Sequence, residues 1–164
     1  MAASTTKKVM IRRFDREPMA GYVHPGTYLR PNGVELLTTD GGFAVVPYHE
    51  VKAVHFVRDF DSPPEPAEAR VFHTRPKMDG LWVRMRFRDH EVMDGILPNN
   101  LLQIDPYGFT VTPPEPYSNN QRVFVPKTAL AELQVLGVVG SPLRPRKQKA
   151  RAVPQEQISL FEPQ

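Results

Sequence analysis

The 164-residue chain contains no cysteine. Disulfide frameworks, cysteine nucleophiles and cysteine-ligated zinc or iron–sulfur centres are therefore excluded. The sequence also lacks any run of about 18 apolar residues, which a transmembrane helix requires. Charged residues occupy the N-terminal stretch 1–14, where an export signal would place its apolar segment, so we expect a cytoplasmic protein.

Motifs of the common enzyme classes are missing as well. The phosphate-binding patterns GxxxxGK[ST] and GxGxxG do not occur, nor does the GxSxG pattern of serine hydrolases. No two histidines have the spacing of a zinc motif such as HExxH or HxH. We therefore expect a non-enzymatic protein that uses no metal and no cofactor. The histidines are His24, His49, His55, His73 and His90.

Proline and glycine, by contrast, are abundant, with 18 and 10 residues respectively. Together they exceed their average share of roughly 12% and break the chain into short pieces, which favours a mainly β fold. Alternating or β-branched runs predict strands over 9–14, 19–23, 34–38, 43–46 and 54–60, separated by turn sequences such as HPG, PNG and DGG. The segments 48–53 and 126–133 have few breakers and are the two candidates for a short helical turn.

An internal repeat organises the chain. VMIRRFDREPMAG at 9–21 matches VRMRFRDHEVMDG at 83–95 with an offset of 74 residues. GGFAVVP at 41–47 is similar to YGFTVTP at 107–113. VKAVHFV at 51–57 and LAELQVL at 130–136 then close the two copies. The repeated order indicates a duplication.

The first copy resembles an Sm-like or SH3-like small β-barrel. The resemblance rests on a strand, a charged turn, a glycine-containing second strand (AGYV) and a short turn before the last strand (PYHEVKAVHF). The second copy, with FRDHEVMDGIL at 87–97 followed by GFTVTPPEPYSNNQRVFVPKTAL at 108–130, also resembles an uncharacterised bacterial domain. The resemblance implies two tandem small barrels over 1–60 and 70–140, joined by the proline-rich acidic linker 61–69.

The net charge of +3 belongs to the C-terminal region. Residues 1–140 contain 16 basic and 16 acidic side chains, whereas residues 141–164 contain 5 basic and 2 acidic ones. A neutral body argues against a DNA-binding face on the barrels. With almost no large apolar side chain, the segment 141–156 predicts a disordered tether whose cations contact nucleic-acid phosphates. These cations are Arg144, Arg146, Lys147, Lys149 and Arg151.

The pentapeptide QISLF at 157–161 follows this basic stretch. It resembles the peptide with which bacterial replication and repair proteins bind the β sliding clamp, the β subunit of DNA polymerase III. A chance match is expected in only about 0.3% of chains of this length. The alternative is a terminal strand or helix that docks its apolar side chains on the body. The resemblance assigns clamp binding to Gln157, Ile158, Ser159, Leu160 and Phe161.

Two further groups of residues have both a functional and a structural interpretation. The D-x-E pairs Asp15/Glu17 and Asp89/Glu91 recur in both copies. They could bind magnesium or share a proton, but a solvated turn between two strands explains the recurrence. The loop 113–126 could contact a ligand or a single strand, or could be a stiff hairpin. Its candidate residues are Tyr117, Asn119, Asn120, Gln121 and Arg122.

Together these patterns favour a non-enzymatic adaptor tethered to the replication or repair machinery by its clamp-binding peptide. The alternative function is an Sm-like protein that binds RNA or single-stranded DNA, with an incidental tail. A third option is a clamp-tethered nuclease that uses the D-x-E carboxylates with Arg12 and Arg86.

Overall fold

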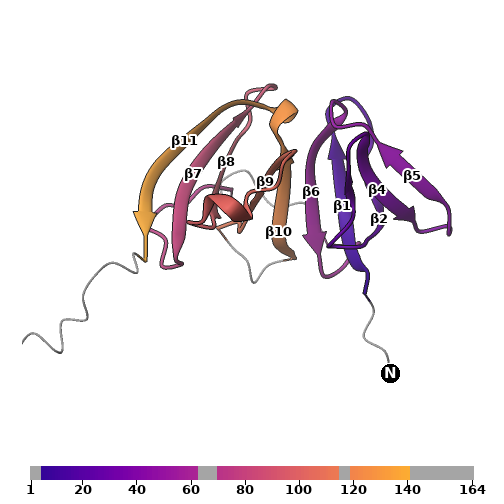
Figure 1. Cartoon of the computed structure of the whole chain (residues 1–164), viewed down its shortest axis with the longest axis horizontal. Coiled ribbons are helices and arrows are strands. Elements are labelled where there is room, and N and C mark those ends of the chain that lie inside the picture. Colours follow the sequence, from indigo (N-terminus) through magenta and orange to yellow (C-terminus); the bar gives the residue numbers. More distant parts are fainter. Residues whose placement is uncertain (1–4, 63–69, 115–118, 141–164) are drawn as a thin grey trace, which may run out of the picture.

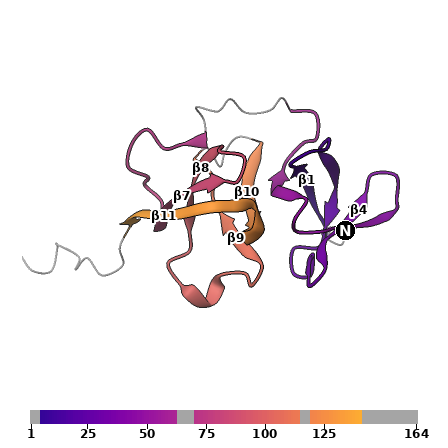
Figure 2. The same ribbon diagram turned by 90° about the horizontal axis from the view of Figure 1, so that it is seen from above.

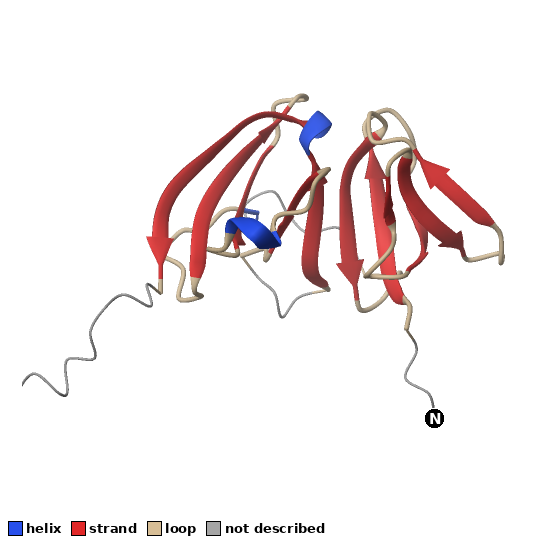
Figure 3. Cartoon of the chain, in the orientation of Figure 1, coloured by secondary structure: helices blue, strands red, loops and turns tan. Residues whose placement is uncertain are grey.

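The computed structural model describes residues 5–62, 70–114 and 119–140. Most of the predicted linker 61–69 and the whole predicted tail 141–164 lie outside these ranges. Within them the chain forms β-strands and short 3₁₀ turns and no α-helix, so the prediction of a mainly β protein is confirmed (Figure 3). No helix in this part of the chain is long and apolar enough to cross a membrane.

The strands of the first half are β1 (Lys7–Arg13), β2 (Met19–Val23), β3 (Leu29–Arg30), β4 (Gly33–Thr38), β5 (Phe43–Val46) and β6 (Val51–Val57). Those of the second half are β7 (Gly80–Phe87), β8 (Val92–Leu97), β9 (Gly108–Val111), β10 (Asn120–Pro126) and β11 (Leu130–Val139), with the 3₁₀ turns η2 (Leu101–Gln103) and η3 (Lys127–Ala129).

Neighbouring strands in the first half pair antiparallel in the order β5-β4-β2-β1-β6, with the short β3 beside β4. In the second half β11 pairs with β7, β7 with β8, and β9 with β10. A single bridge between Ile96 and Thr112 connects β8 to the end of β9. The order of strands is therefore the same in both halves.

Individual residue pairs repeat along with the strand order. Val9 lies opposite Gly21 between β1 and β2, and Val83 lies opposite Gly95 between β7 and β8, 74 positions later. An irregularity in the pairing recurs as well. β6 skips Lys52 where it pairs with β1, and β11 skips Ala131 where it pairs with β7. A shared bulge at the same place in both halves fixes the local twist of the last strand in the same way.

The similarity of 41–47 to 107–113 does not correspond to equivalent strands. The first segment lies on β5, the fourth long strand of its half, whereas the second lies on β9, the third of its half. The residue pairs instead match β4 with β9 and β5 with β10. Valine and phenylalanine are common in strands and glycine in the turns beside them. Two strands that are not equivalent can therefore have similar sequences, and the match of these two segments was wrong.

The two predicted helical segments form no more than a turn. Residues 48–50 make a turn and β6 begins at 51, while η3 covers only 127–129 before β11 begins. Both regions lead into strands that pair along their length, and these tertiary hydrogen bonds outweigh a weak local preference for helix.

The halves are joined by a pair of strands rather than only by the linker. β10 of the second half pairs antiparallel with β6 of the first, so one sheet continues across both halves (Figure 1). Seen from above, the other strands of the two halves are grouped on opposite sides of this junction (Figure 2). The sequence did not predict this pairing.

The hydrophobic core also crosses the junction. Phe124 on β10 is fully buried in the core of the first half, where its ring lies 6.1 Å from that of Tyr28. Ala53 on β6 packs in turn into the core of the second half. Each half therefore completes its core with a side chain of the other, and we expect the body to unfold in one step.

Close packing at the second strand of each half gives a first testable prediction. A Cβ at Gly21 would lie 2.5 Å from the Leu37 carbonyl oxygen, and one at Gly95 would lie 2.7 Å from the Val111 side chain. We expect Gly21→Ala and Gly95→Ala each to lower the free energy of unfolding by about 1–3 kcal/mol, and Gly21→Ala to cost more because backbone yields less than a side chain. Urea unfolding measures both. Gly26→Ala is the matched control, since a Cβ there meets nothing within 4 Å, and a loss of similar size in Gly26→Ala would contradict the prediction.

Candidate functional site

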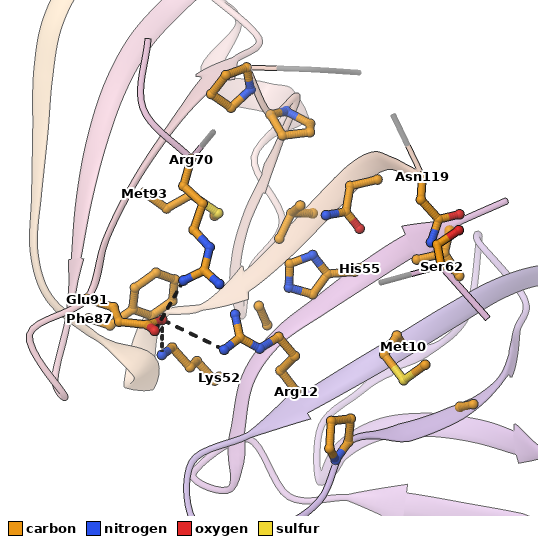
Figure 4. A pocket seen from close by; sticks show the side chains of 18 of the residues that line it. Met10, Arg12, Lys52, His55, Ser62, Arg70, Phe87, Glu91, Met93 and Asn119 are labelled. Atoms are coloured by element: carbon orange, nitrogen blue, oxygen red, sulfur yellow. Dashed lines mark hydrogen bonds and ion pairs between the residues drawn. The ribbon is translucent and has the colours of Figure 1, made fainter. Parts of the chain in front are cut away.

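A cavity of about 520 Å³ lies where the two halves meet (Figure 4). Residues of β1, β2 and β6 line it from the first half, and residues of β7, β8, β10 and the β7–β8 turn line it from the second. Met10, Val57, Phe60 and Met93 contribute apolar surface. Its volume falls in the range of small-molecule sites.

Lys52 lies at the charged end of this cavity. It is only 4% exposed, although it is the position at which β6 bulges away from its pairing with β1. Its Nζ donates hydrogen bonds to Asp89 Oδ2 at 2.5 Å and to Glu91 Oε2. The ammonium also lies 5.1 Å from the centre of the Phe87 ring, a cation–π contact.

Glu91 is the centre of the charged group. Besides Lys52 it contacts Arg70, with Nη1 to Oε1 at 3.1 Å, and Arg12, with Nη2 to Oε2 at 3.9 Å. Figure 4 shows the three basic side chains converging on it from separate segments. With Asp89, two carboxylates face three cations, so most of the positive charge is neutralised internally.

The two carboxylates remain ionised at neutral pH. Partial burial alone would raise the pKa of Asp89, but the hydrogen bonds from Lys52 and from the Glu91 N–H outweigh it and lower the pKa below its usual value. Burial likewise opposes ionisation of Glu91, and Lys52, Arg70 and Arg12 together lower its pKa. Folding therefore holds both groups in the charged form.

His55 on β6 lines the same cavity. Both ring nitrogens are shielded from solvent, and neither makes a hydrogen bond in the described part of the chain. Burial, with the nearby charges of Arg12 and Arg70, lowers the pKa of His55 to about 3. The imidazole is therefore neutral at physiological pH.

The described candidate residues of the predicted ligand loop lie in different surroundings. Asn119 uses its side chain to hold the neighbouring segment: its Oδ1 accepts from the backbone N–H groups of Arg58 and Asp59, and its Nδ2 donates to the Asp59 carbonyl. Asn119 and Asn120 line the junction cavity, whereas Arg122 lines a second cavity of about 650 Å³. The bulge between Asn120 and Arg122 separates them. Gln121 is exposed, and Tyr117 lies outside the described residues.

The two D-x-E pairs have different surroundings. Asp15 and Glu17 are exposed on the β1–β2 turn. Asp89 closes the β7–β8 turn by accepting from the Glu91 N–H at 3.2 Å, and this second pair also binds Lys52. Across the described ranges, no three histidine, aspartate or glutamate side chains converge as a metal site would require. The two pairs thus share their place on the turn between the first two strands of each half but not their partners.

Sequence reasoning missed the two central residues of this site, Lys52 and His55. A signal was present, because both are polar residues inside the apolar run VKAVHFV. A strand that is apolar at nearly every position is buried on both faces, so polar residues within it face an interior. The predicted clamp peptide 157–161 and the five basic residues of 144–151 lie outside the described residues.

Comparison with known families places the chain. A model of a family of unknown function, DUF6982, matches residues 5–137, which include every strand of the first half and nearly all of β11. The chain belongs to this family. The match treats both halves of the DUF6982 protein as one unit, in agreement with a core that crosses the junction. No solved structure matches the chain.

The charged group gives a second prediction. Replacing both carboxylates with Asp89→Asn and Glu91→Gln leaves the buried Lys52 ammonium without its partners, and we expect the free energy of unfolding to fall by about 3 kcal/mol. Lys52→Met should cost less, because Asp89 and Glu91 are 38% and 40% exposed and can be hydrated instead. Urea unfolding at pH 7 measures both.

The duplicated turn supplies the control for this comparison. Asp15→Asn with Glu17→Gln changes the equivalent exposed pair and should shift stability by less than about 0.5 kcal/mol. Equal losses in the two double variants would show that Lys52 does not depend on its carboxylates.

His55 gives a third prediction, on pH. Its ordinary pKa of 6.5 is lowered to about 3 in the folded chain, so below pH 6.5 the unfolded chain takes up a proton that the folded chain does not. The contribution of His55 to the free energy of unfolding is therefore fully present above pH 6.5 and is lost progressively as the pH falls toward 3. We expect the titration of His55 to account for a loss of about 1–2 kcal/mol between pH 7 and pH 5.

Urea unfolding at these two pH values, with wild type and His55→Gln, tests the assignment. The variant should lose clearly less stability on acidification. His49→Gln is the control, because the His49 side chain is 74% exposed and this variant removes a histidine without altering the cavity. An unchanged slope in His55→Gln would refute the role of His55.

Proposed function

We propose that this DUF6982 protein is a non-enzymatic adaptor that binds a bacterial β sliding clamp through residues 157–161. The observation that carries the proposal is the pentapeptide QISLF, which follows a segment with five basic side chains. Leu160 and Phe161 would insert side by side into an apolar cleft of the clamp, and the Gln157 amide would fix the register by hydrogen bonding.

The body of the adaptor would consist of two small barrels of the Sm-like or SH3-like kind, joined edge to edge through β6 and β10. In support, the strand order and the residue pairs repeat between the halves, including the bulge at Lys52 and Ala131. A strongly curved five-stranded sheet of short strands can wrap its own core as a partly open barrel, which leaves its two edge strands free for other pairings. A duplication and fusion of one such unit accounts for the repeat.

Electrostatics favour this proposal over a body that binds nucleic acid. The three cations at the junction cavity are paired with carboxylates, and residues 1–140 have no net charge. Phosphate binding draws its affinity from unneutralised lysine and arginine. The contact with DNA is therefore assigned to the basic segment 144–151, which would reach the duplex that the clamp encircles and add to the affinity of the peptide.

The fourth prediction tests the peptide. Purified clamp should bind the full chain with micromolar affinity, about −7 to −8 kcal/mol after the cost of ordering the peptide. Replacing both anchors, Leu160→Ala with Phe161→Ala, should abolish measurable binding, because each buried anchor contributes about 1.5–3 kcal/mol. Isothermal titration of clamp into each protein gives the result.

A matched control lies on the body. Leu101→Ala with Leu102→Ala removes two adjacent exposed leucines of η2, which are 76% and 95% exposed, and should leave clamp binding intact. Absence of binding by wild type at ~100 μM clamp, or equal binding by wild type and the anchor variant, would contradict the proposal.

A further arm separates the peptide from the basic segment. Changing the five cations of 144–151 to glutamine should leave the affinity for free clamp nearly unchanged. It should weaken binding to clamp loaded on DNA and reduce its salt dependence. An equal loss in both assays would assign the cations to the clamp itself.

A further inference from the structure

The contact between β6 and β10 shows how edges of this fold pair. Arg122 lies opposite Phe56, Val123 opposite His55, and Phe124 opposite Val54. β6 is the last strand of the first half, and β10 is the next-to-last strand of the second. Within a single chain, the junction therefore joins the edge of a last strand, β6, to the edge of a next-to-last strand, β10.

Each of these edges has a counterpart in the other half. The last strand of the second half is β11. Its pairing with β7 repeats that of β6 with β1, so that Val135 corresponds to Phe56 with an offset of 79. The same offset relates β5 to β10. Val46 pairs with Val34 next to Gly33, and Val125 pairs with Phe109 next to Gly108.

The glycines at these positions support the assignment. A Cβ on Gly33 would lie 2.3 Å from the Val46 carbonyl oxygen, and one on Gly108 would lie 2.2 Å from the Val125 carbonyl oxygen. The same close approach of the two strands thus occurs at the same step in both halves. β5 is therefore the equivalent of β10, and β11 that of β6.

Both counterpart edges are unpaired on one side within the described ranges. β5 pairs only with β4, and β11 pairs only with β7. They lie at opposite ends of the molecule (Figure 1). Both carry exposed apolar side chains: Phe43 is 77% exposed on β5, and Val135 is 56% exposed on β11. Exposed strand edges of this kind are templates for pairing with another chain.

We propose that β11 of one molecule pairs antiparallel with β5 of a second copy, repeating between molecules the junction that β6 and β10 form within one. The offset of 79 transfers the internal pairing directly. The internal pair of Arg122 with Phe56 corresponds to Phe43 of one molecule opposite Val135 of the other. In the same way, the internal pair of Phe124 with Val54 corresponds to Val45 opposite Leu133. The two exposed side chains, Phe43 and Val135, then face each other.

This assembly has a direction. Because β5 and β11 are different surfaces, the contact is head-to-tail and leaves one free edge of each kind on a pair of molecules. Repetition produces a closed ring if the rotation per molecule closes and a filament if it does not. The proposal rests on the equivalence of the two halves and is independent of clamp binding.

Charged substitutions at the two edges test the assembly. Sedimentation of the full chain should show concentration-dependent association. Phe43→Asp, which blocks the β5 edge, and Val135→Asp, which blocks the β11 edge, should each weaken it at least ~tenfold. Leu102→Asp is the matched control, since Leu102 is 95% exposed but lies away from both edges, on η2.

Mixing the two edge variants distinguishes a head-to-tail contact from a symmetric one. Phe43→Asp keeps an intact β11, and Val135→Asp keeps an intact β5. Each variant alone should show the weakened association, but an equimolar mixture should form dimers that grow no further. Association of Phe43→Asp by itself would indicate a symmetric β11 contact and overturn the proposal.

Cross-linking tests the register. The chain has no cysteine, so a variant with Phe43→Cys and Val135→Cys contains only the introduced pair. Residues directly opposite in an antiparallel pair have Cα atoms about 4.5–5.5 Å apart, within reach of a disulfide. Mild oxidation should link molecules through these positions. The slipped variant, Ala44→Cys with Val135→Cys, should cross-link much less.

Two further outcomes would overturn the proposal. In the first, wild type stays monomeric up to ~100 μM and the variant with Phe43→Cys and Val135→Cys forms no cross-link. A second copy of the chain is then not the partner of these edges. In the second, wild type is monomeric but the full chain with Leu160→Asp and Phe161→Asp associates. Loss of the two apolar side chains has then freed the edge, so the chain's own C-terminal segment is its occupant.

Discussion

The antiparallel pairing of β6 with β10 is the contact on which the rest of the structure depends. It places β6 between β1 on one side and β10 on the other, so that both edges of this strand are hydrogen bonded. It also covers both faces of β6, because the two cores meet there. Phe124 of the second half packs into the first core, and Ala53 of the first half packs into the second. A strand buried on both faces loses most of its contact with water, which explains its almost continuous apolar sequence.

The chemistry of the cavity follows from this burial. The Lys52 side chain on β6 is buried, and it depends on partners from the opposite half. Lys52 finds them in Asp89 and Glu91 of the β7–β8 turn, and Glu91 adds Arg12 and Arg70. Burying an ammonium is unfavourable unless it is paired and hydrogen bonded, so the ion group both depends on the junction and holds its two sides together. His55 meets the same constraint by remaining neutral.

The sequence predicts the local elements well and the long-range ones poorly. The strands at 19–23 and 43–46 have the predicted bounds, since alternation and flanking turns specify them locally. The last strand of the first half was expected at 54–60 and begins at Val51, because its pairing with β1 and β10 extends it into a segment with helical preference. For the site, the D-x-E turn was visible as a repeat. Nothing near it in the sequence indicates that only the second copy meets a buried lysine, since Lys52 lies 37 residues away.

By itself the sequence determined the β class, the position of most turns, the repeat at an offset of 74 and the contrast between a neutral body and a basic C-terminal region. These properties depend on residue type and on spacing over a few positions. Tertiary structure alone decided that β10 pairs with β6, that Lys52 becomes buried, that His55 lines the junction cavity and that β5 and β11 remain as edges. Any of several similar strands could present an edge to another. The choice depends on which pairing buries the apolar surface of both halves together, a sum over contacts between residues that are far apart in the chain.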